Sequence, residues 1–289
     1  MISSLSSVVR RHPIITFFVL TYALTWLAWP LWALGLYPIA PVFSFAPFLT
    51  ALVVLAITQG KSGIGGLLRR MVRWRVGLRW YVAALLIPAG ITLTAAVLNV
   101  LLGAQAPSSA ELGSWTGLLP IFLAVLLIPG LGGAWEEPGW RGFALPRLQS
   151  GRSALFASLI LGVLIAGWHL PLMFVGQVHY SDILTIMGAV IIFNWVFNNA
   201  NGSVLIIMLM HATNNTISGQ LFFPMFSGAD SVRLGWLVAA VWCAVAIVVV
   251  VVAGPAHLSR THHKQEEREE GAEAPGATTP TVPPVPRPA

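Results

Sequence analysis

Residues 153–174, SALFASLILGVLIAGWHLPLMF, form an apolar run with a single ionisable side chain, His169. A transmembrane helix needs about 20 predominantly apolar residues to cross roughly 30 Å of hydrocarbon. This run has that length, and the residues on either side of it are more polar. It therefore predicts one helix that spans a membrane.

Similar apolar runs recur along most of the 289 residues. The chain is 56% hydrophobic and only 9% charged, whereas a soluble domain carries about 25% charged residues. This composition argues against a soluble globular protein and predicts an all-α, polytopic membrane protein with about eight transmembrane helices. The predicted spans are 14–36, 40–58, 80–102, 116–135, 153–174, 182–199, 203–219 and 233–253.

The net charge of +6 is interpreted by position, because Lys and Arg gather in the cytoplasmic loops of membrane proteins. If both termini are cytoplasmic, every Lys and Arg except Arg233 falls on the cytoplasmic side of the eight predicted spans. The charge therefore predicts cytoplasmic termini and membrane lipids as partners, and it gives no reason to expect nucleic acid. A bias toward Arg, Ala, Gly and Trp indicates a bacterial cytoplasmic membrane.

Two segments differ from the apolar runs. KSGIGGLLRRMVRWRVGLRW (61–80) is basic with interleaved apolar residues. It is interpreted either as a segment along the membrane surface, with its arginines toward anionic headgroups, or as a solvated basic loop. The chain after residue 253 is polar and then rich in Pro and Ala. We therefore expect a membrane-embedded domain over 1–253 and a disordered cytoplasmic tail over 254–289.

Two adjacent carboxylates, Glu136 and Glu137, lie in GAWEEPGWRG (133–142), between apolar stretches. An ionisable group at membrane depth costs about 2.5 kcal/mol or more and by default marks a functional site. Glu137 and Arg141 are spaced i,i+4, so an ion pair explains Glu137. Glu136 is about 100° further round a helix, which leaves it without a partner. The other acidic residues are expected in the tail or in outer loops, the latter being Glu111, Asp182 and Asp230.

The two histidines inside predicted spans are His169 and His211. His169 and Glu136 are about equally far along the chain from an expected turn at Arg152. Similar distances along antiparallel helices place two residues at comparable depth. Glu136 and His169 could therefore face each other.

His211 and Asn215 are spaced i,i+4, which places both on one face of the seventh predicted span. They could present two donors to one cavity. Asn214 points about 100° away and is the weaker candidate. Asn194 is interpreted as a polar packing residue.

A carboxylate, two histidines and an amide are the parts of a hydrolytic site. A carboxylate can take a proton from water, and hydrogen-bond donors can stabilise the oxyanion that forms at a carbonyl. The sequence contains neither G-x-S-x-G nor His-Glu-x-x-His, which argues against a serine nucleophile and the usual helix-borne zinc motif. Zinc bound by Glu136, His169 and His211 remains chemically feasible. The cofactor is therefore either none or a divalent metal such as zinc.

Three motifs resemble those of one protein family. EEPGWR (136–141) matches a Glu-Glu-x-x-x-Arg signature, and IAGWHLP (165–171) resembles Phe-x-x-x-His with Ile165 in place of phenylalanine. HATNN (211–215) matches His-x-x-x-Asn. In this order and spacing, over about residues 116–219, the chain resembles the CPBP family of intramembrane proteases, which comprises CAAX proteases and bacteriocin-processing enzymes and is also called the Abi family.

The resemblance implies an eight-helix membrane core that encloses an intramembrane site open toward the cytoplasm. It implies that Glu136 and His169 activate the attacking water and that His211 and Asn215 stabilise the oxyanion. Glu137 and Arg141 would support the site. Ile165 keeps apolar bulk but loses a ring, which affects the shape of the cavity more than its chemistry. Family members have been regarded both as metalloproteases and as metal-independent glutamate proteases.

The function expected from these residues is intramembrane cleavage of a hydrophobic or lipidated peptide or protein at the membrane. Eukaryotic relatives cleave prenylated proteins, whereas a bacterial setting favours a membrane-associated peptide or a self-immunity role. One alternative is a non-catalytic membrane scaffold or chaperone with the same fold. Another is a proton-coupled transporter that uses Glu136, although the chain has no evident internal repeat.

Overall fold

The computed structural model describes residues 2–26, 34–35, 44–108, 111 and 114–259. Every regular element in these residues is helical, which confirms the all-α fold. The count of eight spans is not confirmed. Residues 27–33 and 36–43 of the first two predicted spans, and 260–289 of the predicted tail, lie outside the described part. Five described helices are long and apolar enough to cross a membrane: α4 (Ala46–Met71), α5 (Leu78–Leu101), α10 (Ala154–Phe174), α11 (Asp182–Asn199) and α13 (Gly228–Ala253).

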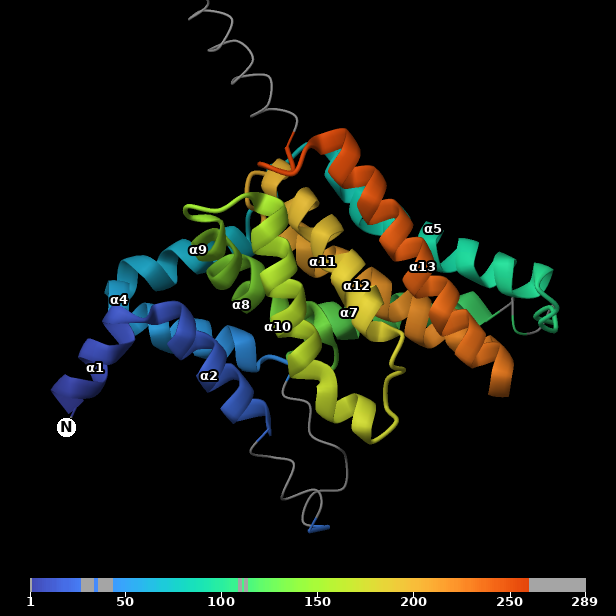
Figure 1. Cartoon of the computed structure of the whole chain (residues 1–289), viewed down its shortest axis with the longest axis horizontal. Helices are drawn as coiled ribbons and strands as arrows, with labels where there is room; N and C mark the ends of the chain where they lie inside the picture. Colours follow the sequence, from blue (N-terminus) through green and yellow to red (C-terminus); the bar gives the residue numbers. More distant parts are fainter. Residues whose placement is uncertain (1, 27–33, 36–43, 109–110, 112–113, 260–289) are drawn as a thin grey trace, which may run out of the picture.

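The central bundle consists of α5, α10, α11, α12 (Val204–Asn214) and α13, and consecutive helices from α10 to α13 alternate in direction (Figure 1). Helix α11 packs against α10 and α13, and α5 packs against α12 and α13. The α11–α13 approach is close at Gly188, where a Cβ atom would meet the carbonyl carbon of Trp242 at 2.8 Å. This bundle forms one wall of the site described below.

The bundle helices begin and end close to where the sequence predicts. The predicted span 182–199 coincides with α11, and 153–174 differs from α10 by one residue. Serine N-caps fix two of the starts, because Ser153 accepts a hydrogen bond from the amide of Phe156 and Ser203 accepts one from that of Ile206. Apolar runs bounded by such caps are the patterns that sequence predicts best.

Large apolar side chains are exposed on the outer faces of the bundle. Leu86 of α5 is 64% exposed, and Ile247 and Val251 of α13 are 63% and 77% exposed. In water such surfaces would be unfavourable, whereas in a bilayer they contact lipid tails. With the length of the apolar helices, this pattern identifies an integral membrane protein.

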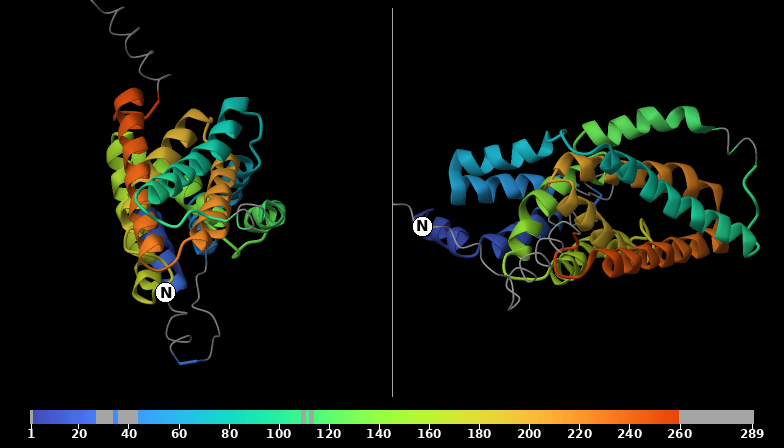
Figure 2. Two further views of the ribbon diagram at one scale, coloured as in Figure 1. Left: turned by 90° about the vertical axis from the view of Figure 1, so that its right-hand side faces the viewer. Right: turned by 90° about the horizontal axis from the view of Figure 1, so that it is seen from above.

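Helices α1 (Ile2–Arg11), α2 (Pro13–Trp26) and α4 lie together beside the bundle (Figure 1). Helix α4 bends sharply at Gly60, whose φ of 65° lies in the left-handed region. Its second half folds back on the first (Figure 2), so that a Cβ atom at Gly63 would be 3.2 Å from Leu55. The predicted span 40–58 corresponds to the first half only. The basic stretch from Lys61 therefore begins as a helix and not as a loop.

The predicted span 116–135 is not one helix, and the prediction is wrong there. A short 3₁₀ turn, η1 (Ser114–Gly117), leads into α7 (Leu118–Leu127), which ends where IPGLGG begins. Proline and glycine disfavour a continuing helix, so the chain crosses to a run of short turns. These are η2 (Gly133–Glu136), α8 (Glu137–Gly139), the π-helical η3 (Trp140–Ala144) and α9 (Leu145–Gln149).

A second π-helical segment follows α12. It is η4 (Asn215–Phe222), which leads through the 3₁₀ turn η5 (Phe223–Met225) to α13. The predicted span 203–219 thus contains a regular helix followed by a wider one. Single π-turns inside helices are common at functional sites.

The residues directly after α13 pack against the bundle. The amides of Ala154 and Leu155 donate to the carbonyls of Ala256 and Pro255 at 2.7 and 3.0 Å. Leu258 is fully buried. Residues 254–259, which were expected to belong to the tail, therefore cap the first turn of α10.

Candidate active site

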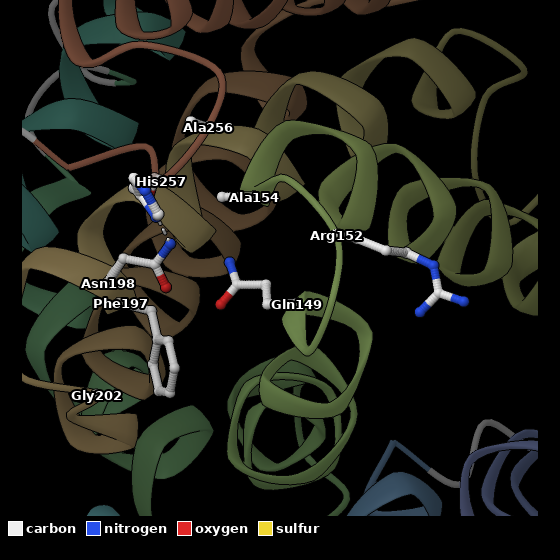
Figure 3. A pocket seen from close by; sticks show the side chains of 8 residues that line it. All are labelled: Gln149, Arg152, Ala154, Phe197, Asn198, Gly202, Ala256 and His257. Carbon is white, nitrogen blue, oxygen red and sulfur yellow. Dashed lines mark hydrogen bonds between the residues drawn. The ribbon is translucent and has the colours of Figure 1, made fainter. Parts of the chain in front are cut away.

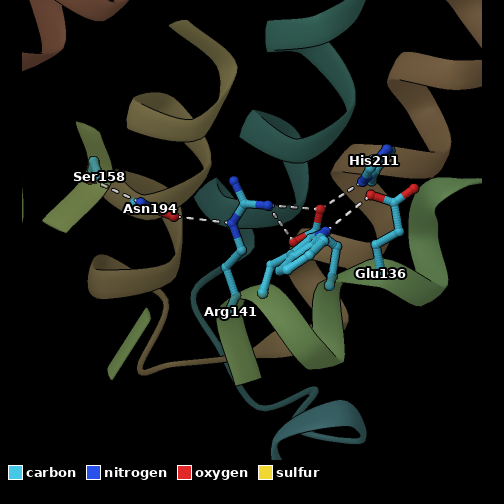
Figure 4. A network of polar contacts seen from close by, with 7 residues as sticks. Glu136, Arg141, Ser158, Asn194 and His211 are labelled. Carbon is cyan, nitrogen blue, oxygen red and sulfur yellow. Dashed lines mark hydrogen bonds and ion pairs between the residues drawn. The ribbon is translucent and has the colours of Figure 1, made fainter. Parts of the chain in front are cut away.

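Glu137 is the centre of the polar network in the core and is 0% exposed. Nη1 of Arg141 donates to both of its carboxylate oxygens, at 3.0 and 2.8 Å. This confirms the i,i+4 pair that the sequence predicted. Nδ1 of His211 lies 2.6 Å from the same carboxylate (Figure 4). Glu137 therefore joins Arg141 to a residue of the third motif.

The network continues from Arg141 to Asn194, which the sequence indicates as a polar packing residue, and to Ser158, which it does not single out. Nε of Arg141 donates to Oδ1 of Asn194 at 3.0 Å, and Nδ2 of Asn194 donates to Oγ of Ser158 at 2.9 Å (Figure 4). Both side chains are fully buried. A polar amide inside an apolar span was the available signal for Asn194, because such groups must find a partner. Asn194 and Ser158 together hold the guanidinium of Arg141 in position against α10 and α11.

Glu136 is 5% exposed and accepts a hydrogen bond from the indole Nε1 of Trp140 at 3.1 Å. The expectation that Glu136 lacks a partner is therefore wrong. Trp140 lies four residues after Glu136, and the sequence did not predict its indole as a donor to Glu136. The Trp140 ring is held by Phe17 and Phe18 of α2 and by Trp168 of α10, with ring centroids 5.6 to 6.0 Å apart. Aromatic packing thus fixes the donor that orients Glu136.

The two histidines of the site are held through their Nδ1 atoms. Nδ1 of His169 lies 2.9 Å from the carbonyl of Ile165, one turn earlier in α10. A carbonyl can only accept, so this bond places a proton on Nδ1 and leaves a lone pair on Nε2 of the neutral ring. Nδ1 of His211 faces the Glu137 carboxylate, which likewise favours a proton on that nitrogen.

Gly133 allows the His211 ring to lie against the turn that precedes Glu136. A Cβ atom at Gly133 would overlap Nε2 and Cε1 of the imidazole. Helix α12, which carries the third motif, and the turn that precedes Glu136 therefore approach more closely than a residue with a Cβ atom at position 133 would permit. This contact brings the Glu136 backbone and the His211 ring together.

A cavity of about 650 Å³ lies over these groups. All six residues that the sequence selected line it, and they come from three separate segments of the chain. Asn214 also lines it, because the helix widens to a π-helix at the next residue, so the expectation that Asn214 points elsewhere is wrong. The selected six are Glu136, Glu137, Arg141, His169, His211 and Asn215.

Asp182 is a further lining residue that was expected in an outer loop. Asp182 is the first residue of α11, and His179, three residues earlier, lines the same cavity. Asp230 was also expected in a loop but lies in the first turn of α13, where it pairs with Arg233 at 2.8 Å. Acidic residues stabilise helix N-termini, which explains both positions.

Glu136, His169 and His211 are the residues that could bind a zinc ion. Among the described residues, no three His, Cys, Asp or Glu side chains lie close enough together to hold one. Glu137 and His211 are bonded to each other, and Glu136 is bonded to Trp140. The arrangement of Glu136, His169 and His211 therefore does not fit a zinc site.

A second pocket, of about 310 Å³, lies at the far end of α10 (Figure 3). It is lined by the start of α10, the end of α11 and the segment after α13, including Gln149, Asn198 and His257. It contains none of the residues that the sequence selected, and it shares no lining residue with the larger cavity.

Comparisons with known proteins match the region of the chain that carries these residues. Residues 114–217 match a family model described as "Type II CAAX prenyl endopeptidase Rce1-like". The chain is also similar to the CAAX prenyl protease 2 of Methanococcus maripaludis, with 24% identity over 212 residues, 67% of this chain and 78% of the relative. The matched region contains all three motifs. Both matches support an intramembrane protease of the CPBP type.

Proposed function

We propose that this intramembrane endopeptidase hydrolyses its substrate with a water molecule activated by Glu136 and His169. The observation that supports this most is the meeting of four motif residues in one cavity. Two of them, Glu136 and His169, can accept a proton, and two others, His211 and Asn215, can donate hydrogen bonds. Acid–base residues of this kind are the minimum that direct hydrolysis of a peptide bond needs.

The first step uses the two acceptors. One proton of the water is held by the carboxylate of Glu136 and the other by Nε2 of His169, whose proton is already on Nδ1. The water oxygen attacks the scissile carbonyl carbon while Glu136 takes a proton. The indole of Trp140 keeps one carboxylate oxygen in place, so the carboxylate does not have to reorient.

The second step uses the donors. Attack converts the carbonyl oxygen to an oxyanion, which accepts hydrogen bonds from Nε2 of a doubly protonated His211 and from the amide of Asn215. The Glu137 carboxylate at Nδ1 stabilises the positive charge on that imidazole. Glu136 then gives its proton to the departing amine as the carbon–nitrogen bond breaks. Fixed donors in a buried site are the strongest means of stabilising such an oxyanion.

We expect the substrate to be a hydrophobic or lipidated segment at the membrane. The wall of the cavity also carries apolar side chains, which include Val125, Ile186 and Val238. The relative is named for prenylated substrates, so a prenylated peptide and the same peptide without its lipid form the natural pair of probes. Faster cleavage of the prenylated peptide would assign the lipid a binding role, and equal rates would assign recognition to the peptide alone.

The mechanism is tested with purified protein in detergent or lipid, using mass spectrometry to follow cleavage of such a peptide. We expect His169→Gln to lose most cleavage, because an amide is a much weaker base than the imidazole Nε2 and activates the bound water less. His12→Gln is the matched control, since His12 is exposed at the junction of α1 and α2. Equal cleavage by wild type and His169→Gln would refute the assigned role.

A further inference from the structure

The bundle has two ends that differ in composition. One, here called the basic end, is formed by residues 72–78, 147–154, 199–204 and 254–259, where α5, α10 and α12 begin and α11 and α13 finish. Hydrogen bonds join these segments: Arg73 donates to the carbonyl of Asn201, and Oγ of Ser203 donates to that of Arg73 at 2.7 Å. The other, here called the mouth end, is formed by residues 102–108, 175–181 and 223–228.

The catalytic cavity opens at the mouth end. Its lining includes the exposed residues Gln177 and His179, from the α10–α11 connection, and the exposed Gln220, from η4. None of its lining residues belongs to the basic end. His169 is about 8 Å from the last residue of α10 and about 22 Å from the first, at 1.5 Å per residue. The reacting groups are thus reached from the mouth end.

The pocket at the basic end does not provide a second route. It is bounded by the segment after α13, whose carbonyls accept hydrogen bonds from the first amides of α10 and from Nδ2 of Asn198 (Figure 3). Leu258 and Ser259, which follow His257 in the chain, are buried, and the carbonyl of Leu258 accepts a hydrogen bond from Nδ2 of Asn199. Among the described residues, the pocket at the basic end shares no lining residue with the catalytic cavity.

The two ends also differ in charge. Of the described residues at or near the mouth end, only Arg233 is cationic, and it is paired with Asp230 and bonded to Asn99. The carboxylate of Asp182 lines the mouth itself. Lys and Arg gather in the cytoplasmic loops of membrane proteins, so the basic end is the cytoplasmic one. The cations at or near that end are Arg70, Arg73, Arg75, Arg79, Arg147 and Arg152.

We propose that the catalytic cavity opens at the non-cytoplasmic face of the membrane, and that the substrate is a peptide segment presented on that side. The second part rests on the proposed function. The opening is opposite to the cytoplasmic one that the family resemblance implied. The expected substrate class is an exported peptide or the outer segment of a membrane protein, with polar residues at the mouth and apolar residues next to the scissile bond.

The sidedness is tested by labelling single cysteines in sealed vesicles. The native Cys243 is first replaced, Cys243→Ala, which leaves no other cysteine. Gln177→Cys reports the mouth, Ser218→Cys reports the cavity wall further in, and Ser150→Cys is the control, exposed beside the basic end. A small, membrane-impermeant, charged thiosulfonate is added to right-side-out or inside-out vesicles.

In right-side-out vesicles we expect Gln177→Cys and Ser218→Cys to be modified and Ser150→Cys to be protected. In inside-out vesicles the pattern reverses. Modification of Gln177→Cys only in inside-out vesicles would overturn the proposal, and so would modification of Ser218→Cys from the side that labels Ser150→Cys. These measurements do not depend on activity.

A second measurement addresses the substrate. An impermeant, water-soluble peptide with an apolar segment is added to the outside of each type of vesicle, with His169→Gln vesicles as the blank. We expect cleavage in right-side-out vesicles only. Cleavage confined to inside-out vesicles would overturn the proposal. Outer-face labelling without cleavage in either preparation would leave the sidedness established and count against the proposed function alone.

Discussion

Helix α10 and the segment from Gly133 to Gln149 are adjacent in the chain and both carry catalytic candidates, yet they are built differently. Helix α10 is one regular helix with a serine cap. The other segment changes from 3₁₀ to α to π geometry within a few turns. Its side chains include Glu136, Glu137 and Arg141, all nearly buried.

The difference shows how the fold separates two tasks. Regular helices satisfy their own backbone hydrogen bonds and meet lipid, so they determine stability in the membrane. The irregular segment is enclosed by protein, and its turns aim neighbouring side chains in different directions. Irregular backbone at membrane depth is tolerated only where it is buried or lines a cavity. Substitutions in the two regions should therefore have different consequences.

The largest expected effect is that of Glu136→Gln in the irregular segment. It removes the proton acceptor but keeps the shape and the hydrogen bond from Trp140. Loss of a general base lowers the rate by about 10²–10⁴-fold. A peptide cleavage assay should show this loss of rate, and thermal melting should show little change in stability. Glu111→Gln, at an exposed residue, is the control. Unchanged cleavage by Glu136→Gln would remove it from the mechanism.

Arg141→Met should mainly reduce stability. It leaves the buried Glu137 with His211 as its remaining charged partner and Asn194 without its donor. Breaking one side of a buried ion pair costs about 3–5 kcal/mol. A large drop in melting temperature is expected. The control Arg152→Met, at an exposed arginine, should be near wild type. A melting temperature equal to wild type for Arg141→Met would show that the network contributes little.

Gly133→Ala tests the close approach of His211 to the glutamate turn. The added methyl would overlap the imidazole, so the ring must shift away from the oxyanion position. A displacement of about 1 Å can cost about 10²-fold in rate. Gly219→Ala is a matched control, because Gly219 lines the same cavity and a Cβ atom there meets nothing within 4 Å. Equal rates for the two variants would contradict this role for Gly133.

Trp140→Phe should have a smaller effect on activity. The phenyl ring keeps much of the aromatic packing, but Glu136 loses its indole donor. A single hydrogen bond contributes about 1 kcal/mol, which corresponds to roughly a fivefold change in rate. The rate constant for cleavage should fall by about that factor. A loss as large as that of Glu136→Gln would mean that Trp140 does more than orient the carboxylate.

Ile247→Ala, on the lipid-facing surface of regular helix α13, should have the smallest effect. The side chain is 63% exposed, so no cavity forms on its removal. Changes at such positions are usually within about 0.5 kcal/mol. Thermal melting and cleavage should both match wild type. A marked destabilisation would show that this face packs against protein and not only lipid.

The candidate site was largely predictable because its residues were exceptional. Charged groups are rare in the apolar runs of this chain, so Glu136, Glu137 and His169 stood out. The i,i+4 spacing was enough to pair Glu137 with Arg141, and the three motifs supplied the family. The role of Trp140 was missed and the partner of Asn194 was not predicted, since an indole and a buried amide carry no charge and their partners depend on tertiary packing.

What the sequence by itself determined is a helical membrane protein, the ends of α10 and α11, and the list of polar residues at depth. These follow from local causes: apolar length, serine caps and helical spacing. The tertiary structure decided the fold-back of α4, the bond from His211 to Glu137 and the end of the bundle at which the cavity opens. Each depends on contacts between segments distant in the chain, and local sequence does not specify those contacts.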